Sequence, residues 1–212
     1  MLQRKLLESS ILLLGCGKMG SALLAGWLTS GIKLKNIYVI EPNPSSWLRS
    51  LEIKGLNLNT AAPRNPTFCV VAVKPQKLSS LTVLIENVNN SNTIFVSILA
   101  GTKIKTLEQF FVSEATVFRV MPNTPALVGE GVSAIIGNIL ASKDEYLMVR
   151  SLFEVVGKVL VLEDENLMDI VTAVSGSGPA YVFYLVEIII KIAKMKGLSE
   201  SVAHDLSIST LS

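Results

Sequence analysis

The residues best suited to bind a ligand form a glycine-rich hexapeptide, Gly15-Cys16-Gly17-Lys18-Met19-Gly20. It follows an apolar run, Ile11 to Leu14, and precedes a stretch with helical spacing, Ser21 to Thr29. This is the G-x-G-x-x-G fingerprint in the strand–turn–helix context that gives it meaning. Free backbone N–H groups and the helix dipole make such a helix start a site for a pyrophosphate. The sequence therefore predicts dinucleotide binding at residues 15–20.

A carboxylate closes the second apolar run, Ile37 to Ile40. Glu41 lies about 20 residues beyond the glycine turn, where a dinucleotide fold places the group that accepts hydrogen bonds from the adenosine ribose. A 2′-phosphate would be repelled there, which favours NAD(H). Two alternatives stay open. Ser45, Ser46 and Arg49 hold a phosphate if Glu41 turns away, or Glu41 is a solvated turn residue.

Three further motifs end predicted strands, and the carboxyl ends of strands line the ligand crevice in this architecture. They are Ala72-Val73-Lys74-Pro75, Ser97 to Gly101 and Met121-Pro122-Asn123-Thr124-Pro125. Lys74 approaches the cofactor through its side chain or its backbone, with Pro75 fixing the turn. The two prolines around Asn123 make a stiff loop suited to presenting polar groups. A surface lysine and a proline-rich connector without chemistry are the alternatives.

Several classes of function are not expected. His204 is the only histidine, and we assign it no role, so no Ser/His/Asp catalytic triad is expected. No grouping of His, Cys, Asp or Glu has the spacing of metal ligands. Hydride transfer needs neither, because the cofactor supplies the reactive atom. A formal charge of +2 without a dense basic cluster predicts no nucleic-acid partner. Cys16 and Cys69 are expected as free thiols in a reducing compartment, hence a cytoplasmic protein.

The order of apolar runs predicts a doubly wound α/β domain over residues 1–162. The predicted strands are Ile11–Leu14, Ile37–Ile40, Phe68–Val73, Thr93–Ile98, Thr116–Val120, Val132–Ile136 and Val159–Leu162. The predicted helices are Lys18–Ser30, Ser45–Lys54, Gln76–Asn87, Ile104–Phe111 and Ser142–Val156. Strands that are apolar on both faces favour a parallel sheet with helices on both sides.

Residues 163–212 contain no convincing strand and predict helices separated by a Ser-Gly turn at Ser175 to Pro179. The helix from Ala180 to Lys196 is apolar nearly all round, so we expect a partner subunit to cover it over Ala180–Met195. Glu187, Lys191 and Lys194 interrupt this stretch. It is also shorter than the ~18–20 uncharged residues of a membrane span, so no membrane association is expected.

These motifs, in this order, resemble pyrroline-5-carboxylate reductases over almost the whole chain. Met121 to Pro125 and Val174-Ser175-Gly176-Ser177-Gly178-Pro179-Ala180-Tyr181 are the specific segments, since generic dinucleotide folds do not carry both. β-Hydroxyacid-type dehydrogenases share Gly-x-Gly-x-Met-Gly, but the second segment argues against them.

The resemblance implies a Rossmann-type domain followed by an all-α dimerisation domain. It implies hydride transfer from NADP(H) or NAD(H) to the C=N carbon of 1-pyrroline-5-carboxylate, giving L-proline. Gly15 to Gly20 and Ala72 to Pro75 would bind the cofactor, and Ser97, Ala100 and Asn123 would lie near the nicotinamide.

The chain departs from the family pattern at one point. Members carry a later Lys-Asp-x-x-x-Ser-Pro-Gly-Gly-Thr-Thr-like segment that holds the substrate carboxylate, and residues 163–212 do not contain it. The helical domain is therefore expected to be incomplete, and no catalytic residue is assigned. A homologue that binds dinucleotide without turnover is the alternative function.

Overall fold

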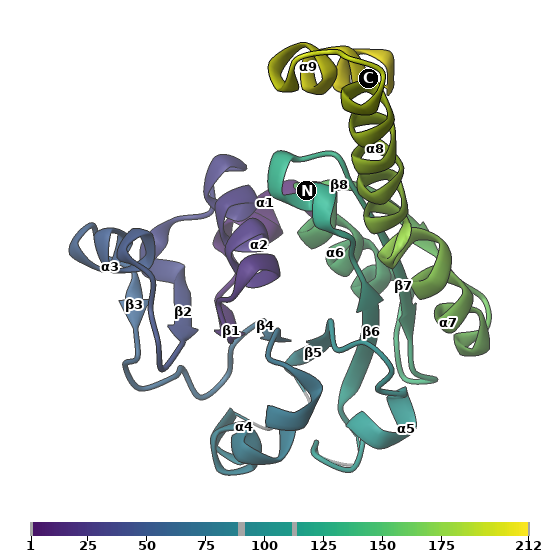
Figure 1. The fold of residues 1–212 in the computed structure, drawn as a ribbon. Coiled ribbons are helices and arrows are strands. Elements are labelled where there is room, and N and C mark those ends of the chain that lie inside the picture. The colour runs from purple at the N-terminus through teal and green to yellow at the C-terminus, as the bar shows by residue number, and fades with distance from the viewer. Residues whose placement is uncertain (1, 89–91, 112–113, 212) are drawn as a thin grey trace.

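An eight-stranded sheet lies at the centre of the computed structural model, which describes residues 2–88, 92–111 and 114–211 (Figure 1). Within these residues the strand order is β3-β2-β1-β4-β5-β6-β7-β8. The strands are β1 (Ile11–Leu14), β2 (Ile37–Ile40), β3 (Asn57–Leu58), β4 (Phe68–Val71), β5 (Ile94–Ser97), β6 (Thr116–Met121), β7 (Gly131–Gly137) and β8 (Gly157–Val161).

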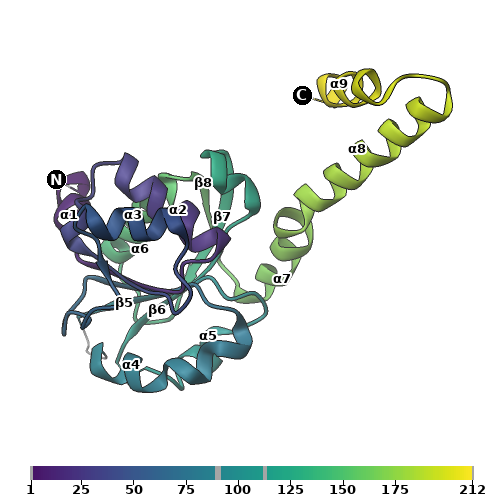
Figure 2. The same cartoon turned by 60° about the vertical axis from the view of Figure 1, so that its left-hand side comes forward.

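Helices cover both faces of this sheet and then continue beyond it. They are α1 (Leu2–Glu8), α2 (Lys18–Thr29), α3 (Ser46–Ile53), α4 (Thr82–Val88), α5 (Ile104–Leu107), α6 (Lys143–Glu154), α7 (Met168–Val171), α8 (Gly178–Met195) and α9 (Glu200–Leu211). In Figure 2, α2, α3 and α6 lie on one face of the sheet, whereas α4 and α5 lie on the other.

The first strand shows why two helix layers are needed. All four residues of β1 are fully buried. Because successive side chains of a strand point to opposite faces, Ile11 and Leu13 join the core under α2, α3 and α6. Leu12 and Leu14 join the separate core under α4 and α5. The predicted doubly wound architecture is confirmed.

The strand order reverses direction at β1. The chain passes from β1 to β2 on one side and later returns to β4 on the other, and both neighbours are parallel to β1. Leu14 is in register with Ile40 of β2 and with Val71 of β4. The carboxyl ends of these three strands therefore coincide, and ligands of open α/β sheets bind in the crevice outside such a switch point.

The expectation of an all-parallel sheet is wrong at one edge. β7 runs antiparallel to β6, pairing Phe118 with Gly137 and Met121 with Ala134, and β8 is parallel to β7. Residues 122–130 form the connection and contain only a 3₁₀ turn at Thr124–Val128. A parallel return needs a crossover of about a dozen residues or more. Antiparallel strands covered on both faces are as apolar as parallel ones, so composition did not separate the two.

Smaller differences have local causes. The predicted helix Gln76–Asn87 is a 3₁₀ helix, Pro75–Leu81, followed by α4. The Ser80 and Thr82 hydroxyls donate to the carbonyl oxygens of Lys77 and Ser79, and such side-chain bonds compete with regular helix bonds. The two-residue β3 is too short to show a periodicity, and α1 was not predicted.

The predicted break at Ser175 to Pro179 is a π-helical turn instead. Residues Thr172–Gly176 are π-helical and lead through a bend at Ser177 into α8. The Ser177 N–H donates to the Thr172 carbonyl oxygen at 2.9 Å, and Pro179 occupies the first turn of α8, where it needs no N–H partner. The helical segment is thus continuous rather than interrupted.

The continuous helix Glu165–Met195 ends in α8, which projects away from the sheet (Figure 2). The last helix, α9, folds back beside the far end of α8. All of α8 is described and none of its residues is buried; Tyr181, Phe183 and Ile192 are each more than half exposed. Among the described residues one helix, Glu165–Met195 with 31 residues, is long and apolar enough to cross a membrane by length and composition alone. This helix is longer than the apolar stretch Ala180–Met195, and the expectation of no membrane association stays a prediction. The domain boundary after residue 162 stays a prediction.

Candidate functional site

The glycine turn begins where only glycine fits. Gly15 follows β1 with φ of +90°, and its N–H donates to the Ile40 carbonyl oxygen at 2.9 Å. A Cβ on Gly15 would lie 2.8 Å from Cγ1 of Val73 and 2.9 Å from the carbonyl oxygen of Ala72. The turn is therefore packed directly against the end of β4, which brings two of the predicted motifs together.

The other two glycines have different surroundings. A Cβ on Gly20 would lie 2.6 Å from the Gly15 carbonyl oxygen, so α2 approaches the turn at backbone contact distance. A Cβ on Gly17 would meet no atom within 4 Å. Gly17 is the N-cap of α2, and no side chain caps the helix. The start of α2 is thus uncapped and has open space beside Gly17, which fits the pyrophosphate of a dinucleotide.

Glu41 faces the glycine turn. Its Oε2 accepts a hydrogen bond from the Cys16 N–H at 2.8 Å, and its Oε1 accepts one from the Asn43 N–H at 2.9 Å. Asn59, at φ of +52°, binds the Glu41 backbone in both directions, accepting from its N–H and donating to its carbonyl. Each carboxylate oxygen keeps a further lone pair. The ribose contact of Glu41 stays a prediction, and the structure adds a bracing role.

The thiol inside the turn is held neutral. Burial is the main cause that raises the pKa of Cys16, the negative charge of Glu41 adds to it, and a hydrogen bond with Ser21 opposes it. The Ser21 hydroxyl also donates to the Cys16 carbonyl oxygen at 3.1 Å. Since the thiolate is the reactive form, this environment disfavours a nucleophilic role for Cys16, and its contact with the cofactor stays a prediction.

The predicted residues at the ends of β4 and β5 differ in exposure. Lys74 is exposed and extended at the start of the 3₁₀ helix that Pro75 opens. Ser97 is buried, and its hydroxyl oxygen accepts the Leu99 N–H at 3.3 Å. Ala100 is exposed in the turn that follows. Lys74 and Ala100 therefore offer surface at the strand ends, while Ser97 fixes the loop beneath.

Asn123 uses its amide within the protein. Its Oδ1 accepts the Val132 N–H at 2.8 Å, and its Nδ2 donates to the carbonyl oxygen and the hydroxyl of Ser175 at 3.4 and 3.3 Å. The side chain thus joins the loop after β6 to β7 and to the π-helical turn. The nicotinamide contact expected of Asn123 stays a prediction.

Arg119 is not among the residues predicted from the sequence. It lies within β6, is almost fully buried, and forms ion pairs with Glu165 and Asp169 at 3.1 and 3.2 Å. The signal was present, since a charged residue inside the apolar run Thr116–Met121 must have a partner when buried.

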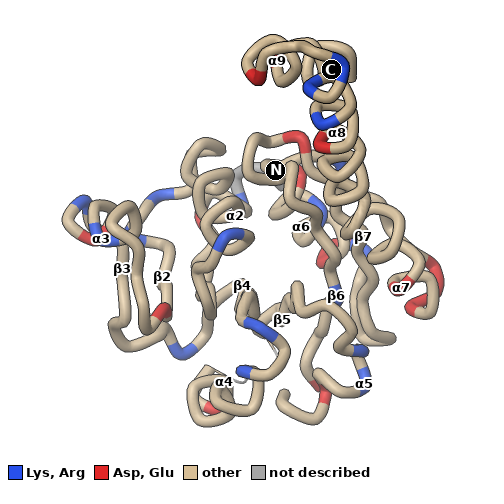
Figure 3. Tube along the Cα trace, in the orientation of Figure 1, with Lys and Arg blue, Asp and Glu red and all other residues tan. Residues whose placement is uncertain are grey.

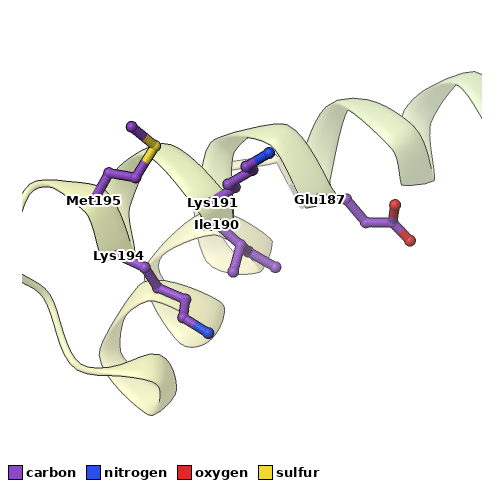
Figure 4. Close-up of a pocket in the computed structure, with 5 residues that line it drawn as sticks. All are labelled: Glu187, Ile190, Lys191, Lys194 and Met195. Carbon is purple, nitrogen blue, oxygen red and sulfur yellow. The ribbon is translucent and has the colours of Figure 1, made fainter.

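A hollow of about 480 Å³ lies on α8, lined by Glu187, Ile190, Lys191, Lys194 and Met195 (Figure 4). It is on the projecting helix, well away from the glycine turn (Figure 1). It therefore belongs to the exposed surface of α8 and not to the strand ends beside the glycine turn.

Residues 165–212 match a family profile described as pyrroline-5-carboxylate reductase dimerisation. Residues 10–101 match one described as NADP oxidoreductase, coenzyme F420-dependent. The pyrroline-5-carboxylate reductase of Mycobacterium tuberculosis is 38% identical over 210 residues, which cover 95% of this chain and 70% of that protein. The chain belongs to the pyrroline-5-carboxylate reductase family.

Solved structures of the family agree with this assignment. Pyrroline carboxylate reductase from Plasmodium falciparum, described with NADP bound, is 31% identical with a TM-score of 0.82, covering 96% of this chain and 76% of its own. The Coxiella burnetii enzyme is 26% identical with the same TM-score, covering 96% and 77%. The family resemblance found in the motifs is confirmed, as is the Rossmann-type domain followed by a helical region.

Proposed function

We propose that the protein reduces 1-pyrroline-5-carboxylate to L-proline, with NADPH as the hydride donor. The observation that carries this is the glycine turn, packed by Gly15 against Ala72 and open at Gly17. The substrate is inferred from family membership, because the relatives at 38% and 35% identity are named pyrroline-5-carboxylate reductase.

The residues present suit a dinucleotide at the switch point of the sheet. Gly15 to Gly20 would hold the pyrophosphate through the uncapped start of α2. Glu41 would lie on the adenosine side. Lys74 and Pro75 would follow along the rim, with Ser97, Ala100 and Asn123 at the nicotinamide end.

NADP(H) is the better supported form of the cofactor, since the Plasmodium falciparum relative is described with NADP bound. The exposed residues Ser46 and Arg49 of α3 would bind the 2′-phosphate. Glu41 directs its two oxygens at main-chain N–H groups of Cys16 and Asn43, which offset part of its charge. NAD(H) remains the other candidate, to be decided by titration.

The bound cofactor would supply a hydride to the C=N carbon. The protein's own residues need only bind the cofactor and the imine, orient them and enclose them, because a protonated cyclic imine is already a good electrophile. Holding the two reactants in line accounts for a large part of the barrier reduction in such reactions. The hydrogen bonds of the buried Ser97 and of Asn123 would hold the loops beside the nicotinamide in a fixed conformation.

The functional form would be a homo-oligomer that buries α8, and the dimerisation profile over residues 165–212 supports this. We propose a cytoplasmic location, which the buried free thiols of Cys16 and Cys69 suit. No nucleic acid or membrane is part of the proposal.

An assay of NADPH oxidation with 1-pyrroline-5-carboxylate, followed by identification of L-proline, tests this function. We expect one proline formed for each NADPH oxidised, and loss of the reaction in Gly17→Ala. Saturable NADPH binding without proline formation by the assembled oligomer would overturn the proposal and favour a dinucleotide-binding homologue without turnover.

A further inference from the structure

A buried arginine binds the first turns of the C-terminal helical segment, Glu165–Met195, to the sheet. Arg119 of β6 places Nη1 at 3.1 Å from Oε1 of Glu165 and Nη2 at 3.2 Å from Oδ1 of Asp169. Its side chain is 2% exposed, while those of Glu165 and Asp169 are 25% and 69% exposed. Figure 3 shows acidic residues gathered at α7, on the side of the molecule where β6 and β7 lie.

Glu165 also reaches the loop that carries Ala100. Its Oε1 accepts the Ile104 N–H at 2.8 Å, at the start of α5. Residues 98–103 connect β5 to α5, so this bond fixes the far end of the loop on which Ala100 lies. One carboxylate oxygen therefore joins β6, α5 and the C-terminal segment.

A second fastening lies further along the same segment. Ser175 of the π-helical turn accepts hydrogen bonds from Nδ2 of Asn123, in the loop after β6. A Cβ on Gly176 would lie 2.9 Å from Cε of Met121, so the turn also packs closely on the end of β6. The C-terminal segment thus contacts both loops that carry the proposed nicotinamide-side residues.

Stability alone does not explain this cluster. Only the Arg119 end of these ion pairs is buried, and neither exposed nor buried ion pairs are a strong source of stability. What these ion pairs add is a defined orientation of the C-terminal helical segment relative to the sheet. Glu165 and Asp169 are four residues apart, about one helical turn, so a single planar guanidinium fixes both the position and the rotation of the segment.

We propose that Arg119 and Glu165 are positioning residues, which hold the C-terminal segment against the Ala100 and Asn123 loops and so set the nicotinamide end of the cofactor site. The proposal rests on the proposed function for its substrate. It predicts that disturbing the cluster changes hydride transfer and nicotinamide binding, while the pyrophosphate and adenosine subsites at the glycine turn keep their affinity.

The test compares Arg119→Met, Arg119→Lys and Glu165→Gln with wild type. The dissociation constants of NADPH and of 2′-phospho-ADP-ribose, which lacks the nicotinamide, are measured beside kcat and KM for the imine. Arg150→Lys is the matched control, because Arg150 forms an exposed ion pair with Glu154 on α6.

We expect unchanged affinity for 2′-phospho-ADP-ribose in every variant. In Arg119→Met and Glu165→Gln, kcat and the affinity advantage of NADPH over the fragment should each fall about tenfold or more. Arg119→Lys should be intermediate, because an ammonium group replaces only part of the planar fork. The control should match wild type.

Two results would overturn the proposal. One is an unchanged kcat and NADPH affinity in Arg119→Met. The other is an equal loss of affinity for NADPH and the fragment together with a lowered unfolding midpoint, which indicates a structural role only. If the wild type bound NADPH but formed no proline, the proposed function would fail, while the comparison of NADPH with the fragment would still decide this inference.

Discussion

The backbone N–H of Cys16 donates a hydrogen bond to Oε2 of Glu41 at 2.8 Å, which ties the middle of the glycine turn to the end of β2. The other oxygen of the same carboxylate accepts the Asn43 N–H. The residue expected to contact the ribose therefore also braces the loop that would hold the pyrophosphate. These two roles predict different outcomes when the carboxylate is changed.

Replacing Glu41 tests which role dominates. In Glu41→Gln one of the two acceptors becomes an NH₂ group that opposes a main-chain N–H, so the turn loosens. Bonds to a charged acceptor contribute about 1.5–3 kcal/mol, so we expect the affinities for NADPH and NADH to fall together, by tenfold or more. The control is Glu154→Gln, whose exposed carboxylate pairs with Arg150 on α6, outside the proposed cofactor site. Selective loss of NADH binding would instead show that the ribose contact is the main role.

The glycines of the turn should fail in different ways. In Gly17→Ala the new methyl group meets no protein atom within 4 Å, so we expect only the small fall in unfolding midpoint that alanine causes at an N-cap. NADPH binding should weaken strongly, because the methyl group enters the pyrophosphate space. Gly20→Ala would place a Cβ 2.6 Å from the Gly15 carbonyl oxygen, so it should lower the midpoint itself. Thermal unfolding and cofactor titration of both variants separate these effects. Wild-type affinity in Gly17→Ala would contradict the site.

Cys69 predicts an alkaline loss of stability. Burial raises its pKa well above the ordinary thiol value of about 8.5. Above about pH 8.5 the Cys69 thiol loses its proton in the unfolded chain but keeps it in the folded chain. The free energy of unfolding therefore falls as the pH rises, by up to about 1.4 kcal/mol per pH unit.

Denaturant unfolding of wild type and Cys69→Ala between pH 7 and 10 measures this effect. The variant lacks the thiol, so its stability should decline less steeply, whatever constant cost the lost side chain brings. Lysines and tyrosines contribute equally to both curves. Parallel curves would show that the Cys69 thiol is not protected by burial.

The exposed face of α8 should control assembly. Ile188 lies on this apolar helix, and burying an aliphatic side chain contributes about 1.5–3 kcal/mol. Ile188→Asp should therefore shift the protein from oligomer to monomer in sedimentation experiments. Lys191→Gln, on the same helix, should assemble normally. An Ile188→Asp protein that sediments like wild type would place the interface elsewhere.

Much of the fold was predictable because its signals are local. β1 and β2 were predicted to the residue, since each is a short apolar run beside a clear turn. The direction of β7 was not, because it depends on the length of the connection after Met121 rather than on the strand's own residues. The continuity of the C-terminal helix was not predicted because Ser and Gly at residues 175–178 also suit a turn, and the contacts of the π-helical turn with Asn123 and Met121 join residues far apart in the sequence.

The candidate site divides in the same way. Gly15, Gly17 and Gly20 were predictable, because their spacing encodes a backbone requirement. The partners of Asn123 and Arg119 were not. Ser175 is 52 residues from Asn123, and Asp169 is 50 residues from Arg119. Only the folded chain brings these residues together.

The fate of a single hydrogen tests the central claim most directly. The protein is supplied with 1-pyrroline-5-carboxylate and NADPH that carries deuterium at the transferable position of the nicotinamide, and the product is analysed by mass spectrometry. The account predicts L-proline with one deuterium at C5 and an equal amount of NADP⁺. Proline without the label, or bound NADPH that stays reduced beside unchanged imine, would contradict it.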